Sequence, residues 1–186
     1  MADQLYLSYW IPGFTEHNML RHYERMLGLF PYSRLEKRIS TFRIVAIDYA
    51  QPPLLERVLP PQEVLAAAAE FRHADSMYCL DTWWDLWQFD GDWQVAPSPA
   101  SLCCFGPGFE RDMDENLRIE FGIDSHFLPQ PDAPNSPRMV QSNIKSLLKL
   151  VHDLDDALKA DRRRLWSESG DNFAERLQEA LLTNTD

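Results

Sequence analysis

Carboxylates and indoles alternate in the stretch YCLDTWWDLWQFDGDW, which runs from residue 78 to residue 93. If residues 78–89 form one strand, successive side chains point to opposite faces of a sheet. An unpaired buried carboxylate is strongly penalised, so the face that carries Asp81, Trp83, Asp85 and Trp87 is a poor core surface. The opposite face has the character of a core surface and consists of Tyr78, Leu80, Thr82, Trp84, Leu86 and Gln88.

A second candidate strand, residues 117–124, places Glu120 and Asp124 on its outward side, with His126 two residues beyond. If the two strands were neighbours, their polar side chains would converge beside Trp83 and Trp87. The sequence then predicts an acidic, aromatic-walled surface on an open sheet face. The predicted binding residues are Asp81, Trp83, Asp85, Trp87, Glu120, Asp124 and His126.

Such a surface suits a basic protein or a cationic ligand. Indole rings supply anchoring area and cation-π contact, and carboxylates steer a cationic partner toward the surface. The first functional hypothesis is therefore a binding or interaction module, comparable in chemistry to a small acidic inhibitor or immunity-type protein.

Two other interpretations use the same residues. The carboxylates and His126 could form the site of a small hydrolase or another acid/base enzyme, with or without a divalent metal. Alternatively, the acids are solvated or paired with Arg43, Arg118 and Arg138, and the Trp residues pack beneath the C-terminal helix. No phosphate loop, nucleophile elbow, HExxH or dinucleotide fingerprint occurs, so the sequence assigns no cofactor and no metal site.

The negative charge of the chain is concentrated in one segment. The formal net charge is −11, and residues 81–132 hold eleven acids against two bases, a net charge of −9. Such a field repels phosphate backbones, which disfavours nucleic-acid binding, and it attracts basic partners. The basic run Arg162 to Arg164 has a structural role near a helix end, and its contrast with the acidic segment also permits a homodimer.

No apolar run approaches the roughly 20 residues needed to span a bilayer, and no signal peptide precedes the first strand. We therefore expect a cytoplasmic protein without membrane contact. Cys79, Cys103 and Cys104 are too few for a disulfide framework and are expected to be buried free thiols. On a strand, the adjacent Cys103 and Cys104 would point to opposite faces.

The periodicities predict an α+β protein with a ferredoxin-like βαββαβ-type core, an extended, mostly antiparallel sheet and a long C-terminal helix. Asp90-Gly91 predicts a tight hairpin from which Trp93 starts the returning strand. The chain divides into a sheet domain (residues 1–128), a proline-rich linker (129–137) and C-terminal helices packed on the same domain (138–186). Strands are expected at 4–11, 41–50, 54–59, 78–89 and 117–124. A further strand is expected to start at Trp93, to be interrupted by Pro97 and Pro99, and to resume at 101–105. Helices are expected at 16–30, 61–73, 137–166 and 173–182.

Overall fold

Seven antiparallel strands form one open sheet in the order β3-β2-β4-β5-β6-β1-β7. The computed structural model describes residues 3–168. The α+β class, the antiparallel sheet and the long helix near the C-terminus are confirmed. The strands are β1 (Gln4–Trp10), β2 (Thr41–Ala46), β3 (Leu55–Val58), β4 (Ser76–Asp90), β5 (Asp92–Phe105), β6 (Leu117–Ile123) and β7 (Arg162–Ser167). The helices are α1 (Met19–Leu29), α2 (Val64–Glu70) and α3 (Ser136–Leu158), with 3-10 turns η1 (Pro61–Glu63) and η2 (Asp124–Phe127).

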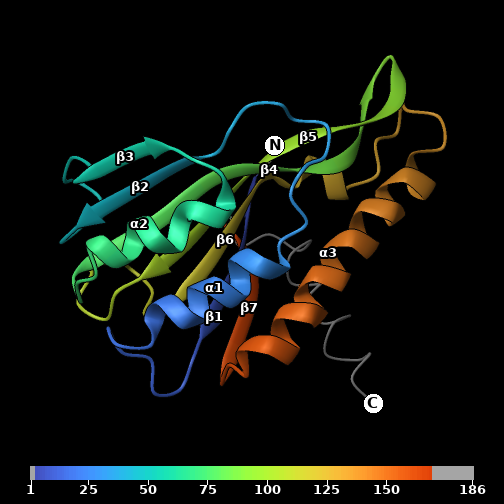
Figure 1. Cartoon of the computed structure of the whole chain (residues 1–186). Coiled ribbons are helices and arrows are strands. Elements are labelled where there is room, and N and C mark those ends of the chain that lie inside the picture. Colours follow the sequence, from blue (N-terminus) through green and yellow to red (C-terminus); the bar gives the residue numbers. More distant parts are fainter. Residues whose placement is uncertain (1–2, 169–186) are drawn as a thin grey trace.

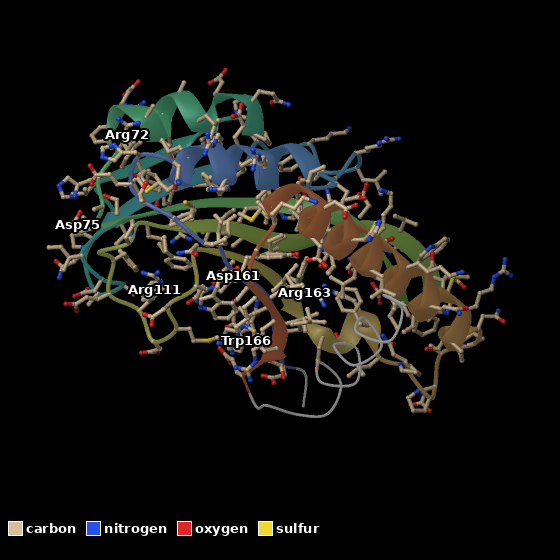
Figure 2. All side chains as sticks on the ribbon, turned by 90° about the horizontal axis from the view of Figure 1, so that it is seen from below. Arg72, Asp75, Arg111, Asp161, Arg163 and Trp166 are labelled. Carbon is tan, nitrogen blue, oxygen red and sulfur yellow. The ribbon has the colours of Figure 1, made fainter. Side chains whose placement is uncertain are left out.

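The three α-helices lie on one face of the sheet (Figure 1). Their apolar stripes pack against the sheet, where Tyr23 of α1, Leu147 of α3 and Leu102 of β5 are fully buried in one core. Figure 2 shows the opposite side of the sheet below α1 and α2, where Arg111 and Trp166 lie. Among residues 3–168, no α-helix covers the opposite face of the sheet. No described helix is long and apolar enough to cross a membrane.

The first six elements follow the predicted order β-α-β-β-α-β. The ferredoxin-like arrangement, however, is not shown, because β5 and β6 lie between β4 and β1 in the sheet. Local periodicity specifies which elements form, whereas strand order depends on contacts between distant segments. The expected βαββαβ core is therefore correct as a succession of elements only.

The C-terminal helix is shorter than predicted. α3 begins at Ser136, inside the expected linker, and ends at Leu158, where its apolar spacing stops and Lys159 adopts a left-handed conformation with φ of 50°. Residues Arg162–Ser167 then form β7, which pairs with β1, so the prediction of a helix continuing to Trp166 was wrong. The predicted helix at residues 173–182 lies outside the described residues.

Strands β4 and β5 form a hairpin that is much longer than its neighbours. β2 pairs with β4 only as far as Asp81, and β6 pairs with β5 only from Ser101 onward. Residues 82–100 therefore extend beyond the rest of the sheet as a two-stranded projection, which we call the hairpin arm (Figure 1). The predicted hairpin is confirmed, with Gly91 at its tip in the left-handed region (φ 78°). The expected interruption at Pro97 and Pro99 was wrong, because β5 begins at Asp92 and pairs with β4 through both prolines.

Candidate functional site

The two faces of β4 divide as the alternation predicts. Tyr78, Leu80, Thr82, Trp84 and Leu86 are buried on the helix side, although Gln88 is only partly buried and donates to the carbonyls of Ala96 and Pro97. Trp84 packs against Phe30, Phe121 and Phe127. The other face carries Asp81, Trp83, Asp85 and Trp87, all of them partly exposed.

Asp81 is engaged within the protein. Its carboxylate pairs with Arg43 of β2 at 3.0 Å and accepts a hydrogen bond from Ser101 Oγ of β5 at 2.6 Å. Glu120 lies opposite Ser101 on the far side, because β5 separates β4 from β6. Asp81 and Glu120 thus share a face but lie two strand spacings apart, roughly 10 Å.

Arg118 organises the carboxylates beside Glu120. Its guanidinium contacts Glu120 at 2.9 Å and Glu115 at 3.0 Å, and it donates to Tyr49 Oη at 2.9 Å. Burial disfavours the charge of Arg118, but the negative partners outweigh this effect and raise its pKa. Burial also raises the pKa of Glu115, which is inaccessible to solvent. This cluster fastens segment 106–116 to the sheet and leaves Glu120 paired.

Asp85 holds a loop. One carboxylate oxygen accepts a hydrogen bond from Ser33 Oγ, and the other accepts the backbone N–H of Arg34 at 2.9 Å. Ser33 Oγ in turn accepts the N–H groups of Leu35 and Glu36. The carboxylate therefore organises the turn at residues 33–36, a structural role that the sequence did not indicate.

The ring of Trp83 makes a cation-π contact with an arginine of the same chain. The guanidinium of Arg38 lies 4.7 Å from the centre of its ring and is paired with Glu36 at 2.8 Å. A cavity of about 200 Å³ lies beside this contact and is lined in part by Tyr32 and Ile39. The loop that Asp85 anchors thus covers part of Trp83 with the chain's own arginine.

Beyond Asp85, toward the tip of the arm, the same strand face carries apolar side chains. Trp87 pairs with Val95, and Phe89 pairs with Trp93, with the two rings of the latter pair 5.4 Å apart. Val95 is 40% exposed, and Trp87, Phe89 and Trp93 are partly exposed. We call the four residues Trp87, Phe89, Trp93 and Val95 the arm face.

Asp124 and His126 lie elsewhere. They belong to η2, not to the end of a strand, and Asp124 is buried, with Oδ1 accepting the N–H of Asp3 at 3.0 Å. The carbonyl of His126 accepts a hydrogen bond from Asn143 of α3, so this turn packs against the helix layer. Burial lowers the pKa of His126. The expected convergence with Asp81 required neighbouring strands, and the intervening β5 removes that premise.

The acids of segment 81–132 thus fall into two classes. Asp81, Asp85, Glu115, Glu120 and Asp124 have partners inside the protein. The remaining six are exposed, and their carboxylates make no hydrogen bond or ion pair with a described residue. They form two groups: Asp90, Asp92 and Asp132 at the arm tip and the loop before α3, and Glu110, Asp112 and Asp114 in segment 106–116.

The loop before α3 reaches the arm tip, since Trp93 Nε1 donates to the carbonyl of Pro134. This contact brings the loop that carries Asp132 to the tip that carries Asp90 and Asp92. Sequence reasoning missed this acidic tip as a site of its own because the contact joins segments 41 residues apart. The Asp90-Gly91 turn predicted the positions of Asp90 and Asp92 at the tip, but it did not predict that the loop with Asp132 reaches the same place.

The described residues hold no group of three or more His, Cys, Asp or Glu side chains that could bind a metal. Compared with known proteins, the chain matches no family model, no curated protein and no solved structure.

Proposed function

We propose that this protein is a binding module whose hairpin arm engages a basic partner. One observation carries the proposal: the arm face presents partly exposed aromatic rings beside a tip with three exposed carboxylates that pair with no described residue. Aromatic side chains provide large contact areas at low conformational cost, and carboxylates at the rim guide a cationic partner.

An apolar or guanidinium group of the partner would contact the rings of the arm face. Further cations of the partner would contact the carboxylates at the tip. The chain's own Arg38 makes this type of contact with Trp83, backed by Glu36. Arg is the cation most often found over aromatic rings. An arginine of the partner would find the same pairing at Trp87, with Asp90, Asp92 and Asp132 in place of Glu36.

The two groups of open acids supply a matched test. The triple change Asp90→Asn, Asp92→Asn and Asp132→Asn removes three charges at the tip, and Glu110→Gln, Asp112→Asn and Asp114→Asn removes three charges from segment 106–116. Affinity for a labelled arginine-rich peptide is measured by fluorescence anisotropy at low salt, where screening is weak. The tip variant should bind about tenfold more weakly, a change of about 1.4 kcal/mol, and the segment variant should bind nearly as the parent protein does.

Equal losses in both variants would show that the peptide responds only to net charge, and the proposed site would be rejected. Trp87→Ala, which removes a ring without altering charge, should weaken binding as well. A natural partner captured from the source cells counts as support only if it is basic, is lost with the tip variant and is retained by the segment variant.

A further inference from the structure

Two of the three cysteines face each other across the β4–β5 pair. Cys79 and Cys103 are directly opposite in the register, and both thiols are free and only 2% exposed. Directly opposite residues of antiparallel strands have Cα atoms about 4.5–5.5 Å apart. Disulfides join Cα atoms about 4.4–6.8 Å apart. The strand pairing thus sets the backbone at a separation that a disulfide accepts.

The third thiol is excluded from this pairing. Cys104 points to the helix side, where it belongs to the main core and its sulfur lies 3.8 Å from the carbonyl oxygen of Met19. Cys103 belongs to a separate cluster on the opposite face, together with Cys79, Phe105 and Phe109. The sheet therefore selects one dithiol out of the three possible cysteine pairs.

Arginines flank the dithiol in the same transverse row. Arg43 of β2 is opposite Cys79, and Arg118 of β6 is opposite Cys103. Nearby guanidinium groups favour a thiolate, which is the reactive form of cysteine. The pKa of the Cys103 thiol is raised, first by its hydrogen bond to Cys79 and then by burial. This hydrogen bond joins the two sulfurs that a disulfide would link.

We infer that Cys79 and Cys103 form a dithiol–disulfide site that is oxidised by a small-molecule disulfide such as oxidised glutathione. The thiolate of one of the two cysteines attacks one sulfur of the oxidant, the oxidant's S–S bond breaks, and one glutathione thiolate leaves. The other cysteine then loses its proton, and its sulfur displaces the second glutathione from the first cysteine. The protein loses two hydrogens and gains one S–S bond, while one glutathione disulfide becomes two glutathione thiols.

Segment 106–116 controls access to this site. Phe109 packs on the dithiol cluster, and Arg111 donates to the carbonyls of Gly106, Phe109 and Glu115. The backbone N–H of Glu110 also bonds Ile47 O at 2.8 Å. Oxidation of the folded protein is thus limited by opening of this segment, and Arg111→Met, which removes three donated hydrogen bonds, should accelerate it several-fold.

The test uses a Cys104→Ala protein, in which only the proposed pair remains. The folded protein is incubated with oxidised glutathione, then denatured in the presence of an alkylating reagent, and the mass of the intact protein is measured. The expected product has lost two hydrogens, carries neither glutathione nor alkyl groups, and regains both alkylation sites after reduction. Its melting temperature should exceed that of the reduced protein, because the cross-link restricts the unfolded chain.

Two results would overturn the inference. In the first, both thiols of the folded protein remain available for alkylation under conditions that oxidise the unfolded chain. In the second, the reaction stops at a mixed disulfide between the protein and glutathione. If Cys104→Ala does not fold, peptide mapping of the oxidised parent protein decides the question. A link between residues 79 and 103 supports the site, and a link to Cys104 rejects it. Neither readout depends on partner binding by the hairpin arm.

Discussion

Asn143 holds the backbone of Trp87 at both of its polar groups, although 56 residues separate them in the chain. Its Oδ1 accepts the N–H of Trp87 at 2.8 Å, and its Nδ2 donates to the carbonyl of Trp87 at 2.8 Å. In an antiparallel strand, the N–H and C=O groups of every second residue point to the same edge, so those of Trp83 and Trp87 point to one edge of β4. β2 forms backbone hydrogen bonds with this edge of β4 as far as Asp81. Beyond it, the N–H of Ser33 donates a hydrogen bond to the carbonyl of Trp83 at 2.7 Å. Asn143 thus supplies the next contact and takes the place of a neighbouring strand.

Asn143→Ala should therefore destabilise the protein by about 2–4 kcal/mol, because it leaves buried donors and acceptors without partners. Nδ2 also serves the carbonyl of His126, so three hydrogen bonds disappear together. Urea unfolding followed by circular dichroism measures the loss. As a comparison, Ser146→Ala on the same helix removes only an exposed hydroxyl and should stay within about 0.5 kcal/mol of the parent. Equal effects of the two changes would contradict this role of Asn143.

Trp84 and Trp87, on opposite faces of the arm, should respond differently to truncation. Trp84 is 1% exposed and lies among Phe30, Phe121 and Phe127. Trp84→Ala should cost about 3–5 kcal/mol, as expected for a large cavity in a core. Trp87→Ala should cost much less in stability and act mainly on binding. The free energies of unfolding of both variants decide the point, and a larger loss for Trp87 would show that the core and binding faces are interchanged.

The amphipathic elements and the faces of β4 follow from the sequence because their periodicities are local. The hairpin register does not. A two-residue Asp90-Gly91 turn would pair Phe89 with Asp92, whereas the structure pairs Phe89 with Trp93. A shift of one residue moves every side chain of the returning strand to the other face. The opposition of Cys79 and Cys103 depends on that single residue, and the turn signal alone did not fix it.

The partners of the predicted site residues could not be derived from local patterns either. The ion pair between Asp81 and Arg43 joins positions 38 residues apart, and Asp85 meets Ser33 across 52 residues. Both contacts depend on strand order and loop path. β7 was missed because RRRLWS continues a helical stretch in sequence, and only pairing with β1 makes it a strand. The sequence thus identified an aromatic, acidic region but assigned several of its carboxylates to a partner when they serve the fold.

Asp85→Ala tests that division directly. Loss of the contacts to Ser33 and Arg34 should destabilise the protein by about 1–3 kcal/mol and release the loop that places Arg38 over Trp83. Tryptophan fluorescence should change in the folded state as the cation leaves the ring. Asp90→Ala is the control, because that side chain is exposed at the tip and its loss should leave both stability and folded-state fluorescence nearly unchanged. If the two variants are equally stable, Asp85 does not organise the loop.

Stability should fall in mild acid in part because of His22. This residue is 7% exposed on α1, and its Nδ1 has no hydrogen-bond partner among the described residues. Burial, followed by the nearby Arg25 and Arg21, lowers its pKa below the ordinary value, which is about 6.5. The unfolded chain therefore binds a proton at higher pH than the folded protein does. The contribution of neutral His22 to the free energy of unfolding is fully present above the pKa that His22 has in the unfolded chain. It is lost as the pH falls through the pKa that His22 has in the folded protein.

His22→Leu removes this titration and keeps an apolar side chain on the buried face of α1. The difference in unfolding free energy between pH 7 and pH 5 should shrink in the variant, and urea midpoints at the two pH values measure it. Part of the dependence should remain, because burial also lowers the pKa of His126. An identical pH dependence in the parent and the His22→Leu protein would show that His22 is not protonated differently in the folded and unfolded states.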